Sequence, residues 1–254
     1  MTDKGQMVVV TGGTRGVGAG IARRFLAAGA RVVVCARRPP GAPVEAGGAA
    51  AEFRALDVRD AAAAAGFFAA VAADHGRIDV LVNNAGGTPF GLLAETPAAR
   101  QRKIVELNLL SPLYASLGAY EVMRHQQEGG AIVMIGSVSG TRPSPGSGAY
   151  GAAKAGLENL ARTMAVEWAP HVRVNTVVLG LTRTESSALH YGDAEGVAAV
   201  GRTVPLGRLA DPADVGDACV FLASDAARYV SGAALHLHGG GERPAFLDAA
   251  SVNH

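Results

Sequence analysis

Cysteine is scarce in this sequence, and the little that is present excludes two common ways of stabilising a protein. Cys35 and Cys219 are the two cysteines among 254 residues. They form neither a disulfide framework nor a metal-ligand spacing, and Cys35 lies in an apolar run typical of a buried thiol. His236 and His238 share one face of an expected strand, but no third ligand accompanies them. We therefore predict no metal site, and the free thiols fit a reducing, cytoplasmic location.

Excess charge and long apolar runs are also absent. The formal net charge is +1, so no broad basic field would attract nucleic acid or an acidic membrane. The longest apolar stretch, near Ala61 to Ala73, is shorter than the ~20 residues of a membrane-spanning helix. The first four residues are polar, and the apolar run Met7–Val10 is too short for a secretion signal. We predict a cytoplasmic protein with no membrane or nucleic-acid partner.

What the sequence does contain is an alternation of short β-branched runs with longer stretches rich in alanine and leucine. Near-continuous apolar runs are typical of strands buried on both faces. The order predicts a single domain over residues 1–254, an α/β Rossmann-like fold with a doubly wound parallel sheet and helices on both faces. Expected strands are Met7–Val10, Arg31–Cys35, Glu52–Asp57, Val80–Asn83, Ala131–Ile135, Val172–Val178 and Ala234–His238. Expected helices are Gly16–Ala28, Ala61–Asp74, Ala98–Tyr120, Tyr150–Trp168 and Asp211–Ala223.

The first strand runs directly into a glycine-rich turn, and an expected helix follows. Glycines at such a junction allow a tight turn and a close approach of the backbone to a pyrophosphate, which the helix N-terminus attracts. A purely structural turn is the alternative. The residues expected to contact a dinucleotide are Gly12, Thr14, Arg15, Gly16, Val17 and Gly18.

The spacing Gly-x-x-x-Gly-x-Gly resembles the cofactor loop of the short-chain dehydrogenase/reductase family, in its branch of ~250-residue members. The similarity extends from Val8 to about Gly240. Leu56-Asp57-Val58 is similar to the segment that flanks the adenine, and Asn83-Asn84-Ala85-Gly86 to the turn after the fourth strand. The resemblance implies that Asp57, Val58, Asn84, Ala85 and Gly86 also contact the cofactor.

The end of the second strand indicates which dinucleotide is preferred. An acidic residue here would hydrogen-bond the ribose 2′-hydroxyl of NAD. This sequence has Ala36 followed by Arg37. Arginine can pair with a 2′-phosphate, and Arg15 could reach the same group. In the family this pattern accompanies NADP(H), so we predict NADP(H) over NAD(H), although both arginines could be merely solvated.

Tyr150 and Lys154 are spaced i, i+4 and so share one face of an expected helix. A free phenol has a pKa of about 10, and a nearby ammonium should lower that pKa and make tyrosine a useful general acid/base. Tyr-x-x-x-Lys alone occurs often by chance. Its context adds Ser137, after a buried strand, and Asn108, within an apolar helix. Asn108, Ser137, Tyr150 and Lys154 match the family's catalytic tetrad in order.

The resemblance assigns a role to each member of that tetrad. Tyr150 would exchange the proton, Lys154 would also hold the nicotinamide ribose, and Ser137 would orient the substrate oxygen. Asn108 would hold a water that links the lysine to solvent. Ser139 is a second hydroxyl close to Ser137, but the family register favours Ser137.

The sequence departs from the family after the sixth strand. Leu179 stands where the family usually has proline, while Gly180, Thr182 and Thr184 are expected cofactor contacts. Val178 and Leu181 could form apolar walls near the nicotinamide or simply pack in the core. Residues Gly180–Thr203 are a candidate mobile lid, with an ordinary surface helix pair as the alternative.

The predicted activity is NADP(H)-dependent hydride transfer between nicotinamide and a ketone or secondary alcohol. A 3-oxoacyl-[acyl-carrier-protein] reductase is an alternative. However, the basic residues that dock the carrier in such enzymes correspond here to Glu128 and His171. A non-catalytic NADP(H)-binding regulator is a second alternative, and a sugar-nucleotide epimerase would need more chain after Lys154. The resemblance also implies a homotetramer or homodimer, and no segment specifies the small-molecule substrate.

Overall fold

Seven parallel strands form the centre of the molecule in the order β5-β2-β1-β6-β7-β8-β9. The computed structural model describes residues 5–242, 244 and 245, so the ends of the predicted 1–254 domain lie outside the described residues. The strands of this sheet are β1 (Met7–Thr11), β2 (Arg31–Ala36), β5 (Glu52–Ala55), β6 (Val80–Asn83), β7 (Gly130–Ser137), β8 (Val172–Leu179) and β9 (Ala234–Leu237). The predicted Rossmann-like parallel sheet is confirmed.

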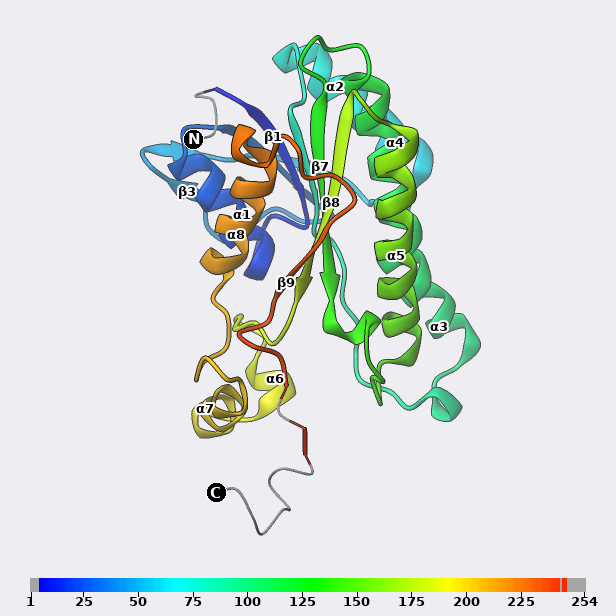
Figure 1. Cartoon of the computed structure of the whole chain (residues 1–254), viewed down its shortest axis with the longest axis vertical. Coiled ribbons are helices and arrows are strands. Elements are labelled where there is room, and N and C mark those ends of the chain that lie inside the picture. The colour runs from blue at the N-terminus through cyan, green and yellow to red at the C-terminus, as the bar shows by residue number, and fades with distance from the viewer. Residues whose placement is uncertain (1–4, 243, 246–254) are drawn as a thin grey trace.

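Helices cover both faces of the sheet (Figure 1). On one face α1 (Gly16–Ala27) packs against α8 (Pro212–Ala223), and on the other α2 (Ala61–His75) packs against α4 (Ser111–Met123) beside α5 (Gly148–Glu167). The remaining helices are α3 (Ala98–Val105), α6 (Ala188–Tyr191) and α7 (Ala194–Thr203). Short helical turns complete the description: η1 (Leu93–Glu95), η2 (Glu106–Leu110), η3 (Val138–Gly140) and η4 (Asp225–Ala227).

Two hydrophobic cores, one on each face, explain why the inner strands are apolar over most of their length. All five residues of β1 are buried, because Met7 and Val9 point into one core and Val8 and Val10 into the other. Side chains alternate across a strand, so a strand buried on both faces loses the usual polar alternation. The continuous valine runs of the sequence follow from this arrangement.

The strand order reverses at β1, which lies between β2 and β6. Val10 is in register with Val34 on one side and with Val82 on the other. Connections leave these strands toward opposite faces at such a point, so a crevice opens at their carboxyl ends. The fold therefore places a ligand crevice directly beyond Thr11.

The helix expected over Ala98–Tyr120 is wrong in one respect, because a π-helical turn interrupts it. η2 separates α3 from α4. The Ser111 amide donates to the Glu106 carbonyl, five residues back, and the Ser111 hydroxyl donates to the same oxygen at 3.0 Å. Pro112 follows without an amide hydrogen, so it can donate no hydrogen bond at the start of α4. Such turns are frequent at functional sites, and this one contains Asn108.

Smaller differences concern loops and element ends. A two-stranded hairpin, β3 (Glu45–Ala46) with β4 (Ala49–Ala50), fills a connection for which no element was expected. Its turn is Gly47-Gly48, with φ angles of 62° and 78°, which a side chain would strain. β5 ends at Ala55, two residues before the expected end. The predicted lid region contains α6 and α7.

Two features expected to be absent can be examined over residues 5–242. No helix in this part of the chain is long and apolar enough to cross a membrane. Nor do three or more histidine, cysteine, aspartate or glutamate side chains gather there in a way that could hold a metal ion. The polar first four residues, which bear on the secretion-signal prediction, lie outside the described residues.

Candidate active site

A single cleft of about 730 Å³ at the carboxyl edge of the sheet gathers nearly every residue that the sequence singled out. Asn108 is the exception, since it is fully buried behind the cleft. The predicted residues that line the cleft are Gly12, Thr14, Arg15, Gly16, Val17, Gly18, Arg37, Asp57, Val58, Asn84, Ala85, Gly86, Ser137, Tyr150, Lys154, Gly180, Thr182 and Thr184. Residues scattered over most of the chain thus meet on one surface, and their individual roles stay predictions.

The glycine-rich turn forms one end of the cleft and is held tightly against the rest of the fold. A Cβ added at Gly18 would collide with the Gly12 carbonyl oxygen and with Nδ2 of Asn84. Gly16 begins α1 with φ of 54°. The N-cap, Arg15, makes no side-chain cap and the first turn of α1 has no acidic residue. The positive end of this helix therefore faces the cleft.

Thr11 and Asn84 join the ends of β1 and β6 below this turn. The Thr11 hydroxyl accepts from the backbone amides of Asn84, at 3.0 Å, and Ala85, at 3.1 Å. In return, Nδ2 of Asn84 donates to the carbonyls of Thr11 and Gly12 at 2.9 and 3.2 Å. Asn84 therefore acts here as a brace. Thr11 was not predicted as a site residue, although it is the first residue of the turn motif.

Arg59 is a second residue that sequence reasoning missed, and it lines the cleft beside Asp57. Its Nε donates to Oδ1 of Asp57 at 2.9 Å, and its Nη2 pairs with Oδ2. Hydrogen bonds from Arg59 lower the pKa of Asp57 to about 2, and the charges of Arg59 and Arg37 act in the same direction. The Asp57 carboxyl is therefore ionised at neutral pH. It holds Arg59 at the cleft, where Arg15 and Arg37 also lie.

Tyr150 and Lys154 lie in the first two turns of α5 and face the cleft together. The Lys154 ammonium donates to the carbonyl oxygen of Ile135, near the end of β7, at 2.7 Å. It lies 5.6 Å from the centre of the Tyr150 ring. The two groups that the i, i+4 spacing paired are therefore neighbours on one wall of the cleft.

The pKa of Tyr150 moves in the opposite direction from the sequence prediction. Burial raises the pKa of Tyr150, and a hydrogen bond with the Ser137 side chain lowers it by a smaller amount. Burial also lowers the pKa of Lys154 to about 8. The expected net lowering of the Tyr150 pKa by Lys154 is therefore wrong, because desolvation disfavours both charged forms.

Ser137 ends β7, and its hydroxyl accepts from the Ser139 amide at 3.2 Å. Ser139 does not line the cleft, whereas Ser137 does. The position of the two hydroxyls thus agrees with the choice made from the sequence register. Ser137 and Tyr150 come from adjacent elements and meet at the cleft surface.

Asn108 lies behind the cleft wall and hydrogen-bonds the backbone there. Its Oδ1 accepts from the Gly87 amide at 2.8 Å, and its Nδ2 donates to the carbonyls of Gly87 and Ile104, both at 2.9 Å. A Cβ added at Gly86 would lie 2.7 Å from Oδ1 of Asn108 and 3.4 Å from Nζ of Lys154. Asn108 therefore fixes the turn that separates it from Lys154.

Comparison with known sequences agrees with this geometry. The family described as enoyl-(acyl carrier protein) reductase matches residues 12–242. The chain is 36% identical over 244 residues to the 3-oxoacyl-[acyl-carrier-protein] reductase FabG of Escherichia coli, which covers 94% of this chain and 98% of that relative. It is also 36% identical over 250 residues to 3beta-hydroxysteroid dehydrogenase 1 of Eggerthella lenta, which covers 93% of this chain and 94% of that relative.

Solved structures of similar proteins point to the same family of oxidoreductases. A short-chain type dehydrogenase/reductase from Mycobacterium ulcerans superposes with a TM-score of 0.85 at 31% identity, over 94% of this chain and 90% of that one. The chain belongs to the short-chain dehydrogenase/reductase family. The aldohexose dehydrogenase of Thermoplasma acidophilum is also similar, with a TM-score of 0.87 at 28% identity over 99% of this chain and 97% of that one. This short-chain dehydrogenase/reductase is an oxidoreductase, and the resemblance predicted from its sequence is confirmed.

Val178 and Leu181 do not line the cleft of this dehydrogenase/reductase, and Val178 packs in the core, which was one of the two expected alternatives. Leu179, the residue in place of the family's proline, lines the cleft. Val178 is fully buried in the sheet, and Leu181 lines a separate cavity beside His236 and His238. Strand alternation explains the difference, because Leu179 and Val178 face opposite sides of β8.

Further residues that line the cleft of the enzyme belong to segments in which the sequence shows no recognisable motif. Arg100 and Lys103 reach the cleft from α3, and Glu185, Ser186 and His190 reach it from the lid region. Nothing in the sequence pattern could have identified them, because their positions depend on how α3 and the segment after β8 fold over the carboxyl edge of the sheet.

The positions proposed for carrier docking lie elsewhere in this dehydrogenase/reductase. Glu128 and His171 precede β7 and β8, so they lie at the amino edge of the sheet, opposite the cleft. Glu128 pairs there with Arg77 at 3.2 Å. Both cysteines are buried, as expected for Cys35, and burial raises the pKa of Cys35 to about 12.

Proposed function

We propose that this chain is an NADP(H)-dependent oxidoreductase that interconverts ketones and secondary alcohols, with Tyr150 as the general acid/base. The observation that carries the proposal is the placing of Tyr150 and Lys154 on the wall of the same cleft that ends in the glycine-rich turn. A dinucleotide bound across that edge would bring its nicotinamide to the phenol. The family assignment supports the reaction class.

The residues present fit a nicotinamide dinucleotide. Gly12 and Gly18 let the turn pack against Asn84, because a Cβ at either position would lie within 3.0 Å of its Nδ2. The uncapped N-terminus of α1 is suited to a diphosphate. The cleft, at about 730 Å³, is in the range expected for a ligand of this kind. When bound, the nicotinamide supplies or accepts the hydride.

The preference for NADP(H) rests on charge at the adenosine end. Arg15, Arg37 and Arg59 line this part of the cleft, and Asp57 neutralises one of these charges by pairing with Arg59. Ala36 ends β2 where an acid would select the free 2′-hydroxyl. A 2′-phosphate would therefore meet two uncommitted guanidinium groups.

The protein's own contribution to the reaction is the movement of one proton. A raised pKa keeps Oη of Tyr150 protonated near neutral pH, so the phenol is ready to donate to the substrate oxygen during reduction. Ser137 would orient that oxygen through its hydroxyl. Lys154, when charged, would stabilise the phenolate left behind. Asn108 would preserve the geometry by holding the Gly86–Gly87 turn.

NADPH binding and turnover of a ketone panel test the proposal. Tyr150→Phe should lower kcat by about 10²–10⁴-fold and change the dissociation constant of NADPH by less than about threefold, because the lost hydroxyl acts mainly on the substrate. Wild-type protein that neither binds NADPH nor reduces any ketone would contradict the proposal. Binding without turnover of any panel member would favour the non-catalytic regulator.

A 3-oxoacyl-[acyl-carrier-protein] reductase is the second candidate, favoured by the similarity to the Escherichia coli enzyme. Against it, Glu128 presents a negative charge paired to Arg77 where a carrier-docking enzyme would present a positive one. A carrier-bound 3-oxoacyl substrate should therefore be reduced no faster than the corresponding free thioester. A clear preference for the carrier-bound form would reverse this order of candidates.

We also propose that the enzyme assembles as a homotetramer or homodimer. Exposed apolar side chains lie on the elements expected to form interfaces, namely Leu117 on α4, Val166 on α5 and Leu235 on β9. Light scattering coupled to size exclusion would measure the mass directly, and a monomer at micromolar concentration would contradict this part of the proposal.

A further inference from the structure

A carboxylate from a distant part of the chain lies against the glycine-rich turn. Oε2 of Glu185 is 3.6 Å from the point that a Cβ on Gly16 would occupy, and Cγ2 of Thr184 is equally close. Both residues line the same cleft as Gly12 to Gly18. The segment that follows β8 therefore brings an acidic side chain to the first turn of α1.

The first turn of α1 favours an anion at this point. It begins at Gly16, its N-cap provides no side-chain acceptor, and it contains no acidic residue of its own. The free amides and the helix dipole attract negative charge there. The charge is not supplied from within the helix, so an anion from another segment can take this place.

Glu185 lies near the α1 N-terminus without a hydrogen bond to it, and it has no other partner among the described residues. Its carboxylate makes no hydrogen bond or ion pair within residues 5–242. The other acid that lines this part of the cleft, Asp57, is bound on both oxygens by Arg59. The negative charge of Glu185 is therefore not neutralised by a partner among the described residues, and it can interact with the positive N-terminus of α1.

This inference rests on the proposed function, because a cofactor diphosphate would bind at the same helix N-terminus. We propose that Glu185 is an internal anion that competes with the cofactor diphosphate for the N-terminus of α1. Binding of the dinucleotide then displaces the Glu185 side chain, and the position of the segment that carries it sets part of the affinity for cofactor. Two anions this close would repel each other, although solvent screens part of the repulsion because Glu185 is exposed.

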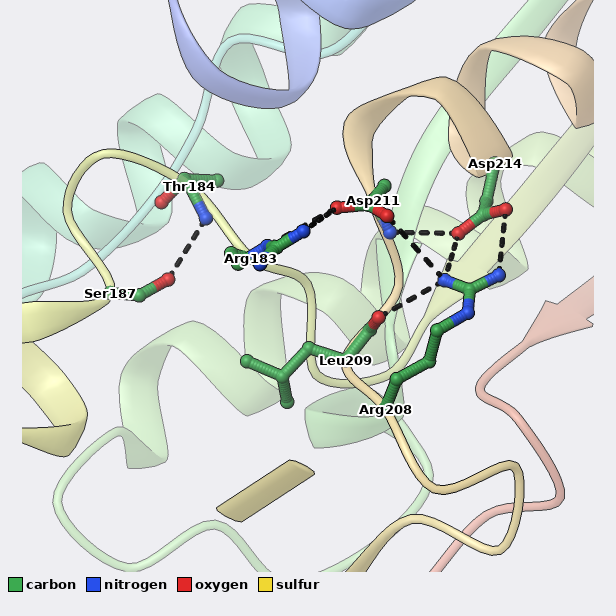
Figure 2. A network of polar contacts seen from close by, with 7 residues as sticks. All are labelled: Arg183, Thr184, Ser187, Arg208, Leu209, Asp211 and Asp214. Carbon is green, nitrogen blue, oxygen red and sulfur yellow. Dashed lines mark hydrogen bonds and ion pairs between the residues drawn. The ribbon is translucent and has the colours of Figure 1, made fainter. Parts of the chain in front are cut away.

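The two ends of the segment that carries Glu185 are fixed to each other at its base, so only the residues between those ends would move when Glu185 is displaced. We define the lid segment as residues 184–207. Before it, the Arg183 amide donates to the Ala210 carbonyl at 2.8 Å, and the Ala210 amide donates back to Leu181 at 3.0 Å. Figure 2 shows the ion pairs that close the same base. Arg183 pairs with Asp211 at 2.9 Å, and Arg208 pairs with Asp214 at 2.6 Å.

Beyond that base, only short-range hydrogen bonds shape the turn that holds Glu185. The Thr184 amide donates to Oγ of Ser187 at 2.9 Å, as Figure 2 shows, and the Ser186 amide donates to Oγ1 of Thr184 at 3.3 Å. These contacts lie within the turn and do not tie it to α1. Glu185 can therefore leave the helix N-terminus without breaking the base of the lid segment.

Titration of NADPH into purified protein, followed by nucleotide fluorescence, tests the charge of residue 185 directly. Glu185→Gln keeps the shape and removes the charge, and should tighten the dissociation constant by roughly 3- to 10-fold. Glu185→Lys should bind at least as tightly as Glu185→Gln. The matched control is Glu195→Gln, an acid in the first turn of α7 that does not line the cleft, and its constant should stay within about twofold.

Inorganic pyrophosphate, measured as a competitor of NADPH, tests the diphosphate group separately from the rest of the dinucleotide. Its inhibition constant should tighten in Glu185→Gln by a similar factor. An unchanged or weaker NADPH constant in Glu185→Gln, with normal wild-type binding, would overturn the competition and leave the proposed function intact. Failure of the wild type to bind NADPH at all would overturn both.

Discussion

At the scale of single residues, the site is defined by charges that burial makes costly. Lys154 is 4% exposed and lies within reach of the Tyr150 ring, with the Ile135 carbonyl as its hydrogen-bond partner. The pKa of Lys154 falls to about 8 because the protein interior disfavours the ammonium. A residue selected only for stability would not keep this charge in the interior.

The low pKa of Lys154 predicts how stability depends on pH. Below pH 8 the folded and unfolded states both hold the proton, so the full cost of burying the charge is present. Between pH 8 and the unfolded pKa of 10.5 the folded state alone loses its proton, and the cost declines. Lys154→Met should therefore gain stability relative to wild type below pH 8, by roughly 3 kcal/mol from this contribution, and the gain should shrink up to pH 10.5.

Urea denaturation of both proteins at several pH values between 6.5 and 10 measures this difference. The exposed Lys103 provides the control, since a surface substitution such as Lys103→Met should stay within about 0.5 kcal/mol of wild type. A pH-independent difference for Lys154→Met would show that the buried lysine keeps its ordinary pKa.

At the scale of elements, the π-helical turn η2 interrupts a helix and thereby sets the position of Asn108 behind the cleft wall that Lys154 lines. It turns Asn108 inward so that its amide satisfies both backbone groups of Gly87. An uninterrupted helix from Ala98 would place the same side chain on a different face, because one extra residue in a turn rotates all that follow.

Asn108→Ala should lower the free energy of unfolding by about 1–3 kcal/mol, because it removes three partly buried hydrogen bonds to the backbone of Gly87 and Ile104. It should also lower kcat more than it raises KM, since the turn beside Lys154 loosens. The exposed Asn159 on α5 provides the control, and Asn159→Ala should stay within about 0.5 kcal/mol of wild type. Equal effects of the two substitutions would argue against a positioning role for Asn108.

The sequence predicted those elements whose pattern is local. The valine runs of β1 and β2 reflect burial on both faces, and the glycine spacing reflects contacts that no Cβ could make. The π-helical turn was missed because it depends on one proline and one buried amide within an otherwise regular helix. Arg59 and Glu185 were missed because what they contact, Asp57 in one case and α1 in the other, is decided by tertiary folding.

At the scale of the whole molecule, the two edges of the sheet differ in chemistry. The carboxyl edge holds the cleft, and the amino edge holds the ion pairs around Arg77 and Glu128. Helices cover both faces between these edges (Figure 1). Apart from the cleft-lining residues at its carboxyl edge, the sheet serves as rigid support, and the segments that follow the strands carry the residues that would contact ligands.

This division predicts an uneven pattern of amide hydrogen exchange. Peptides from β1 and β6 should exchange last, since every residue of both strands is buried. Peptides from the lid segment should exchange earliest among the described residues, because most of its side chains are exposed or half-buried. Mass spectrometry resolves both sets of peptides, and protection of residues 184–207 equal to that of β1 would contradict the prediction.

The paired base of the lid segment has an evolutionary consequence. Arg183 and Ala210 are hydrogen-bonded neighbours, so the intervening residues start and finish at the same place on the scaffold. Insertions or deletions between these points cost little, about 0.6 kcal/mol for each doubling of length. The length and sequence of this one stretch can therefore change while the strands and helices beneath it keep their positions.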